Sequence, residues 1–311
     1  MRTHSQWLYR LMMICGAGLL GVSATLVDYL YEAGYSIPDL TNVQYQLAVI
    51  GLWLGVFVSY RKLKRIPRRR DLLYMAVTGA AAAGGIVFYF QSLRLLPVSL
   101  AIILLFQFTW MVPIIDSIVK RKRPSMQKIT GSAVILIGTV LAVGLDWPQL
   151  KEASAGAAAV GLAAAFCFAI SLYVPEYMKH DSPVIVRAAI TLTFSAAAVL
   201  PVFPPEYVIS GVFKDGLLWW GLLLAVIGQV IPNLFMLSAI PKIGGRTAGV
   251  LGAAELPVTL LSANLILGES MSWLRWFGAA IIVIGIFCSE FRFGAWSIGS
   301  KPSESVDSPL S

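Results

Sequence analysis

The residue whose type and position could most directly do chemistry is Glu255, in the apolar segment GAAELPV (252–258). An ionisable group in so apolar a run is costly to bury, so this carboxylate is a candidate for binding a cationic amine or carrying a proton. Pro257 cannot donate a backbone hydrogen bond, which loosens the carbonyl ladder one turn earlier, beside the carboxylate. We predict that Glu255 binds a cation and couples to a proton, with Pro257 assisting. The alternative is a glutamate hydrogen-bonded within the protein.

Side-chain amides stand in two other apolar runs. Gln107 lies among aromatic residues with Trp110 one turn later, and Gln229 and Asn233 are one helical turn apart. Aromatic faces provide contact area and an amide fixes orientation, so these residues suit a ring-bearing or amphipathic solute. The alternatives are lipid-facing or packing aromatics, and amides that bond to neighbouring helices. The predicted solute-binding residues are Glu255, Gln107, Gln229, Asn233, Tyr89, Trp53 and Trp110.

Other charged residues have simpler explanations. Arg187 lies a few residues inside an apolar run, where its long side chain can reach the lipid–water interface, but we also keep it as a coupling or gating candidate. Asp116 has Lys120 four residues later, which predicts an ion pair on a helix surface. Asp28 and Glu32 end the first apolar run and are expected to be solvated.

These residues belong to a chain of 311 residues, of which 58% are hydrophobic and 13% are charged. Soluble domains carry about 25% charged residues, so the composition excludes an ordinary soluble enzyme. With 11% aromatic residues it also excludes a disordered chain. The length accommodates about ten membrane spans of roughly 20 residues. We predict transmembrane helices over 11–31, 43–60, 72–94, 99–119, 128–145, 154–174, 184–203, 216–239, 247–267 and 274–293.

Lysine and arginine are distributed unequally between alternate loops. With the N-terminus placed in the cytoplasm, 20 of the 24 basic residues fall on the cytoplasmic side, including RKLKRIPRRR (61–70) and KRKR (120–123). The positive-inside rule therefore predicts a multi-pass protein of the inner (plasma) membrane with both termini cytoplasmic. The same pattern accounts for the net charge of +8 without a nucleic-acid partner. The residues on the other side are Arg94, Lys151, Lys214 and Arg275.

The chain contains an internal repeat. SMQKITGSAVILIG (125–138) aligns without a gap on SWLRWFGAAIIVIG (272–285), an offset of 147 residues. Each copy crosses the membrane five times, an odd number, so the two copies must lie upside down relative to each other. Inverted repeats are typical of secondary transporters, which bind solute near the midplane between the halves. We predict a first repeat over 1–147, a second over 148–293, and a cytoplasmic polar tail over 294–311.

Two segments carry a resemblance to a known family. ELPVTLLSANLILGESMSWLRWFGAAIIVIGIF (255–287) contains Pro-Val, an apolar run, Leu-Gly-Glu and two spaced glycines. A weaker first-half counterpart runs from YFQSLRLLPVSLAIILLF (89–106) to QKITGSAVILIGTVLAVG (127–144). With these segments the chain resembles the EamA-type transporters of the drug/metabolite transporter superfamily over nearly its whole length. One departure is VKRKRPS (119–125), where the family often carries Leu-Gly-Glu.

The resemblance implies export, or less often import, of small metabolites such as amino acids, nucleosides, quaternary amines or drugs. It also implies that helices one to four and six to nine surround a central cavity, while the fifth and tenth pack at the periphery. The glycine pairs Gly131/Gly138 and Gly278/Gly285 agree with this arrangement. Members of each pair are seven residues apart, on one helix face where a neighbour can approach closely.

An enzyme and a channel are the competing classes. The histidines His4 and His180 sit at predicted helix ends, and the sequence has no H-E-x-x-H, G-x-S-x-G or P-loop motif. No filter-like loop is present either. We therefore predict no enzymatic activity and no cofactor. The predicted partners are a small-molecule substrate, the lipid bilayer and, if transport is coupled, protons.

The sequence thus predicts a secondary active transporter that exports small metabolites, such as amino acids or related amphipathic or cationic compounds, by alternating access. A facilitator, an exchanger or an importer is the alternative. A monomer suffices because one chain holds both halves, and a homodimer stays open. The substrate, the direction of transport and the coupling ion are not determined by the sequence.

Overall fold

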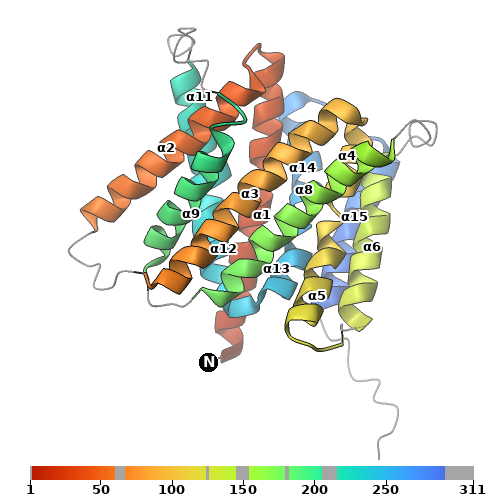
Figure 1. The fold of residues 1–311 in the computed structure, drawn as a ribbon. Helices are drawn as coiled ribbons and strands as arrows, with labels where there is room; N and C mark the ends of the chain where they lie inside the picture. Colours follow the sequence, from red (N-terminus) through yellow and green to blue (C-terminus); the bar gives the residue numbers. More distant parts are fainter. Residues whose placement is uncertain are drawn as a thin grey trace, which may run out of the picture.

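The structure, a computed structural model, describes residues 2–59, 67–123, 126–144, 154–178, 182–204 and 216–290. Every regular element in these ranges is a helix, and the helices form one bundle (Figure 1). The first half contains α1 (Arg2–Glu32), α2 (Ile37–Val58), α3 (Arg69–Leu95), α4 (Val98–Leu105), α5 (Phe108–Val119) and α6 (Met126–Val143). The second half contains α8 (Ala155–Tyr173), the 3₁₀ turn η2 (Val174–Tyr177), α9 (Val184–Val199), α11 (Leu217–Leu224), the π segment η4 (Ala225–Val230), α12 (Ile231–Ile243), α13 (Gly245–Gly252), α14 (Glu255–Ser262), the π segment η5 (Ala263–Leu267) and α15 (Trp273–Glu290).

The predicted fold class is confirmed. Among the described residues, nine helical stretches are long and apolar enough to cross a membrane, and α9 is an apolar helix of 16 residues. Four of these stretches join consecutive elements. They join α4 with α5, α8 with η2, α11 through η4 to α12, and α13 through α14 to η5. The predicted boundary after residue 147 and the tail at 294–311 lie outside the described residues.

Two helix ends differ from the predicted ranges for local reasons. α2 begins at Ile37 rather than at residue 43, because Pro38 occupies the first turn, where its fixed φ favours helix and its missing N–H is no loss. The buried polar residues Asp39 and Asn42 that follow had lowered the hydropathy there. α9 ends at Val199 rather than at residue 203. Leu200 keeps helical φ and ψ, but Pro201 after it has no N–H to donate to the Ala197 carbonyl and so cannot continue the ladder.

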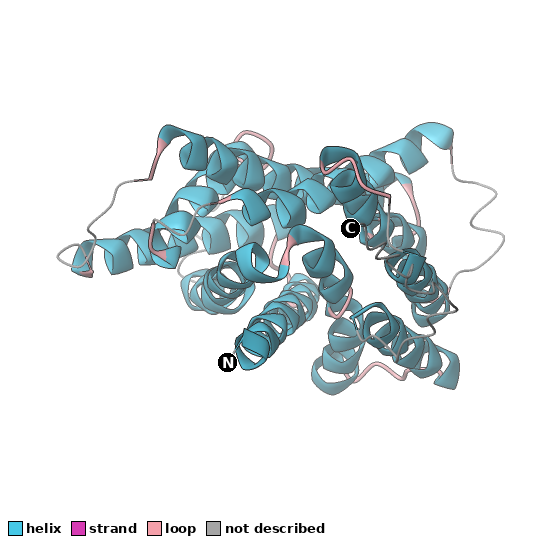
Figure 2. Cartoon of the chain, turned by 90° about the horizontal axis from the view of Figure 1, so that it is seen from below, coloured by secondary structure: helices cyan, strands magenta, loops and turns pink. Residues whose placement is uncertain are grey.

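The helices alternate in direction, which gives the bundle two ends. α1 begins at the end drawn at the bottom of Figure 1 and marked N. We call this end the N-side and the opposite end the far side. α5, η2, α12 and α15 end at the N-side and α13 begins there, whereas α4 and α11 begin at the far side. Figure 2 views the bundle from the N-side and shows that helices, with short connections, form all of its described part.

Two groups of helices meet in the bundle. α1 packs against α12 and α14, and α3 packs against α8 and α9. The fifth helix of each repeat, α6 and α15, forms a third contact at one edge of the bundle (Figure 1). The solute site predicted between the repeats must therefore be sought among α1, α3 and the helices beside them.

Glycines permit the close contact between α6 and α15, as their spacing predicted. A Cβ atom added at Gly138 would lie 2.8 Å from the backbone N of Ile282, and one added at Gly278 would lie 2.3 Å from the backbone N of Ala142. These distances leave no space for a methyl group, because the obstructing atoms are backbone. The two helices therefore touch through main chain along both glycine faces.

We expect Gly278→Ala to destabilise the protein by about 1–3 kcal/mol, the cost of overpacking a tight contact. The added methyl group must push the α15 backbone away from Ala142. Thermal unfolding in detergent measures the effect. Gly51→Ala on α2 is the matched control, since nothing lies within 4 Å of a Cβ added there. Equal melting temperatures for the two variants would contradict the packing role.

Candidate functional site

The fourth helix of each repeat is broken at the same repeat position. α4 gives way to α5 at Phe106 and Gln107, and α13 gives way to α14 at Ala253 and Ala254. The two breaks are 147 residues apart, which is the offset of the internal repeat. Discontinuous helices near mid-membrane are a feature of transporter binding sites.

Each break is a short turn of tighter winding. The Gln107 N–H donates to Leu104 O at 3.2 Å, and the Ala254 N–H donates to Leu251 O at 3.1 Å. Both bonds span three residues instead of the four of an α-helix, which is the 3₁₀ pattern. Such a turn within a helix often marks a hinge.

The break in the second half has a direct cause in Pro257. Because proline has no N–H, the Ala253 carbonyl loses its α-helical donor. It accepts instead from the Leu256 N–H at 3.4 Å. The predicted loosening of the ladder by Pro257 is therefore seen one turn earlier, directly before Glu255.

The first half reaches the same break without a proline at the equivalent position, which is Trp110. Here side chains take carbonyls of the preceding turn. Gln107 Nε2 donates to Ile103 O at 3.0 Å, and Thr109 Oγ1 donates to Phe106 O at 3.0 Å. Local side-chain bonds of this kind compete with regular helix.

Glu255 is the first residue of α14 and follows the break immediately. Its side chain is half-buried, and its carboxylate makes no hydrogen bond or ion pair with any residue in the described ranges. Its backbone is covered by α1, since a Cβ added at Gly21 would lie 2.6 Å from Glu255 O. The carboxylate is therefore held in place by main-chain packing while its own oxygens stay available.

A series of groups leads from Glu255 to the far side. Tyr89, half-buried near the far-side end of α3, interacts electrostatically with both Glu255 and Asp28. Asp28 in turn interacts with Glu269 and with Glu32. Asp28, Glu32 and Glu269 are exposed, as the sequence predicted for the first two. Carboxylates therefore continue from mid-bundle to the far-side surface, an arrangement that attracts cations.

Gln229 and Asn233 lie in a helix–helix contact. Gln229 is buried in the π segment η4 and hydrogen-bonds to Tyr45 of α2. Asn233 Nδ2 donates to the Gln229 carbonyl at 2.8 Å. Nearby, Gln44 Oε1 is buried without a partner among the described residues. Gln229 therefore bonds to a neighbouring helix, whereas Asn233 bonds back to its own helical stretch, and a role of either amide in solute binding stays a prediction.

Gln107 and Trp110 bond to each other, with Trp110 Nε1 donating to Gln107 Oε1 at 2.7 Å. Trp53 is 43% exposed, and its Nε1 donates to Thr193 Oγ1 of α9 at 3.0 Å. Of the predicted site residues, Tyr89 therefore interacts with Glu255, and Pro257 causes the helix break beside it. Gln107, Trp110 and Trp53 form hydrogen bonds with other residues.

Arg187 does not reach the lipid–water interface. Its residue is 2% exposed, and its Nε and Nη1 have no hydrogen-bond partner among the described residues. The reason is the tight contact of α3 with α9, where a Cβ added at Gly79 would lie 2.2 Å from Thr191 O. Asp71 of α3 interacts electrostatically with the guanidinium. The snorkelling expectation was wrong.

Sequence reasoning missed a network of charges at the N-side. Asp116 pairs with Lys120 at 2.5 Å, as predicted, and also with Arg246 at 2.5 Å. Lys120 pairs with Glu176 at 2.5 Å, and Glu176 Oε2 accepts from the Gly245 N–H at 2.8 Å, at the start of α13. Only Asp116 and Lys120 share a helix, so no spacing rule could have found the rest.

The charges of this network reinforce one another. Partial burial lowers the pKa of Lys120, but hydrogen bonds to Asp116 and Glu176 outweigh it, so this pKa lies above its ordinary value. A second group lies beside the first, where Glu290 of α15 pairs with Lys128 of α6 and, at 3.3 Å, with Arg10 of α1.

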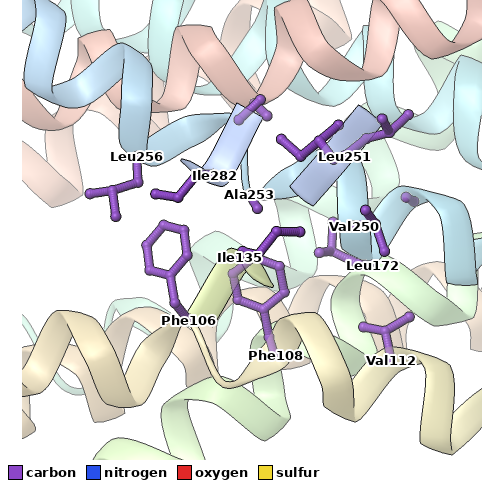
Figure 3. Close-up of a cluster of buried hydrophobic side chains, with 14 of the residues drawn as sticks. Phe106, Phe108, Val112, Ile135, Leu172, Val250, Leu251, Ala253, Leu256 and Ile282 are labelled. Atoms are coloured by element: carbon purple, nitrogen blue, oxygen red, sulfur yellow. The ribbon is translucent and has the colours of Figure 1, made fainter. Parts of the chain in front are cut away.

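An apolar layer separates Glu255 from the N-side network. Figure 3 shows Phe106 and Phe108 directed from the first half toward Leu251 and Ala253 of the second. Phe108 is fully buried, and its ring meets Phe168 of α8 edge to face. The N-side of the bundle is thus sealed by aromatic and aliphatic side chains.

In the described ranges, no three His, Cys, Asp or Glu residues cluster so as to hold a metal ion.

Comparison with known proteins agrees with this architecture. The uncharacterized inner membrane transporter YicL of Salmonella typhimurium is 25% identical over 284 residues, which cover 89% of this chain and 93% of YicL. The uncharacterized transporter YcbK of Bacillus subtilis is 22% identical, covering 91% of this chain and 92% of YcbK. A solved crystal structure matches the fold with a TM-score of 0.66 at 17% identity, covering 92% of this chain and 97% of its own.

The model of the EamA-like transporter family matches the chain twice, over residues 7–144 and 155–290. The two matches coincide with the two halves of the described bundle. This multi-pass membrane protein belongs to the EamA-like transporter family.

Proposed function

We propose that the chain is a secondary carrier that exports small amphipathic or cationic metabolites, such as amino acids or related amines, by alternating access. The observation that carries this proposal is the Glu255 carboxylate, placed directly after a helix break and without a partner in the described ranges. A buried charge needs a partner, so such a carboxylate either takes up a proton or receives a cation. Competition between the two provides coupling to a proton gradient.

The proposed solute meets Glu255 with its cationic group and Tyr89 with its apolar part. The acids Asp28 and Glu269 then attract it along the path to the far side. Gln229 of η4 and Asn233 of α12 border this region. Arg187 lies in the contact between α3 and α9, which moves during transport. Gln107, Trp110 and Trp53 contribute by shaping their helices.

We propose that the N-side faces the cytoplasm, as the distribution of basic residues indicates. Arg10, Lys120 and Arg246 lie at the N-side, whereas Arg94 and Arg275 lie at the far side. The acidic path then connects the site with the outside, where an exported solute leaves. The repeats at 1–147 and 148–293 are the two moving halves, and one chain suffices for the cycle.

The orientation predicts which loops are accessible from outside the cell. In a variant whose native cysteines are replaced, a cysteine at Ser270 should react with an impermeant maleimide in intact cells. A cysteine at Lys122 should react only after permeabilisation, because its loop is cytoplasmic. The reverse pattern would invert the proposed orientation and, with it, the direction assigned to the acidic path.

Proton coupling predicts a specific effect of Glu255→Gln. In proteoliposomes with an imposed pH gradient, wild-type protein should accumulate a labelled solute from a panel of amino acids, quaternary amines and nucleosides. The variant should lose gradient-driven accumulation, because glutamine cannot ionise. Its affinity for a cationic solute should fall about tenfold or more, since losing one partner of a buried charge pair costs about 2 kcal/mol or more.

Glu269→Gln is the matched comparison for coupling, because it removes an exposed acid from the loop after η5 without touching the break. It should keep gradient-driven accumulation, while weaker attraction along the acidic path lowers only the apparent affinity for a cationic solute. Unchanged accumulation and pH profile in Glu255→Gln would refute the coupling role. Saturable exchange that ignores the gradient in wild-type protein would instead identify a facilitator or exchanger, with Glu255 as a binding group.

A further inference from the structure

The two ends of the bundle differ in how the repeats meet. At the N-side, α5 of the first repeat packs against α13 of the second. The offset of 147 residues relates α5 to α14 and α13 to α4. α14 and α4 are the parts of the same two fourth helices that lie beyond the breaks. α4 and α14, both fully described, have no comparable contact. The described state is therefore closed at the N-side and looser at the far side.

Among the described residues, ion pairs reinforce this closure at the N-side. Five ion pairs join residues of the described ranges, and four of them connect the first repeat with the second. All of them lie at the N-side. The symmetry-related positions at the far side, 147 residues away, are Ala263 for Asp116, Leu267 for Lys120 and Ser99 for Arg246.

We propose that Asp116, Lys120, Glu176 and Arg246 form a lock that holds the N-side closed in the resting protein. We call these four residues the N-side lock. The inference rests on the proposed alternating access and adds to it a preferred resting state. Because the described residues of the far side form no matching ion pairs, the lock biases the two otherwise similar ends toward one conformation.

The geometry shows what opening requires. α5 begins and α13 ends at a 3₁₀ turn, so each can rotate about its own break. Separating them pulls Asp116 from Arg246, and moving α5 from η2 pulls Lys120 from Glu176. The same motion removes the Glu176 carboxylate from the N–H group at the start of α13.

The electrostatics make the lock reversible. Two acids face two bases, so the closed lock carries no net charge. The Asp116 side chain is 3% exposed when closed, and opening returns it to water. Buried ion pairs gain little net stability because hydration competes with pairing. A lock of this kind therefore holds by a small margin that a proton or cation binding at Glu255 from the far side can overcome.

A cysteine at Val250 reports on the lock. Val250 lies on α13, is fully buried, and belongs to the apolar layer behind the four charges. The background carries Cys15, Cys167 and Cys288 replaced by alanine. An impermeant maleimide applied to the N-side should label this cysteine slowly in the parent protein. Arg246→Gln should raise the labelling rate by about tenfold, equivalent to about 1.4 kcal/mol.

Three variants separate the lock from general effects. Arg246→Lys keeps the charge and should label nearly as slowly as the parent. Lys120→Gln, which removes a more exposed partner, should raise the rate and guards against misfolding of the Arg246 variant. Lys122→Gln removes a positive charge from the same loop, where Lys122 makes no ion pair with a described residue. It should leave the rate unchanged.

The outcome does not depend on the transported solute. Labelling is measured in vesicles of both orientations, and each variant is checked for an intact melting transition. An unchanged rate in folded Arg246→Gln and Lys120→Gln, or an equal rise in Lys122→Gln, would overturn the lock. A failure of the carrier proposal would appear separately, as absent uptake in proteoliposomes with the labelling differences intact.

Discussion

In the hydrocarbon core of a bilayer no water can bond to a backbone N–H or C=O group, so the protein itself must satisfy each of them. Long helices do this unaided, but the breaks do not. Pro113 leaves the Thr109 carbonyl without its helical donor, and Ser132 Oγ of α6 donates to that carbonyl at 2.9 Å. In the second half Thr259 Oγ1 donates to Glu255 O at 2.9 Å. The irregular backbone of the breaks therefore lies inside the protein. Glu255, whose carboxylate has no partner in the described ranges, lies beside the second break.

The cost of buried charge distinguishes two kinds of acid in this bundle. Asp116 and Glu290 are as buried as any core residue, and each is neutralised by two bases. Glu255 has no such base in the described ranges. Removing one partner of a buried pair costs about 3–5 kcal/mol, whereas replacing both with apolar residues is often neutral. Stability alone therefore does not explain the paired acids. In the proposed alternating access, a contact that forms and breaks in each cycle does explain them, because hydration repays much of the loss on opening.

The sequence predicted most of the fold because the signals are local or repeated. Apolar runs located the ten helices, the offset of 147 related the halves, and the spacing of Gly138 and Gly278 predicted the α6–α15 contact. The site was less predictable. Glu255 and Pro257 could be found because each is unusual in its own segment. The burial of Arg187 depends on how closely α3 approaches α9, and Arg246, the second base that pairs with Asp116, lies on α13 of the other repeat, so neither follows from spacing.

The end of the fourth helix shows how a symmetric fold acquires unequal ends. The second half ends this helix with Leu267, Gly268 and Glu269, where Gly268 has φ +68°; the first half has Lys120, Arg121 and Lys122, where Arg121 has φ +50°. A left-handed conformation costs a residue other than glycine about 1–2 kcal/mol, so glycine would make the same turn with less strain. The basic run therefore serves something other than the turn. It supplies positive charge to an N-side loop, and through Lys120 it supplies the base that joins Asp116 to Glu176. The backbone repeats are alike, and we propose that these side chains determine which end is closed in the resting protein.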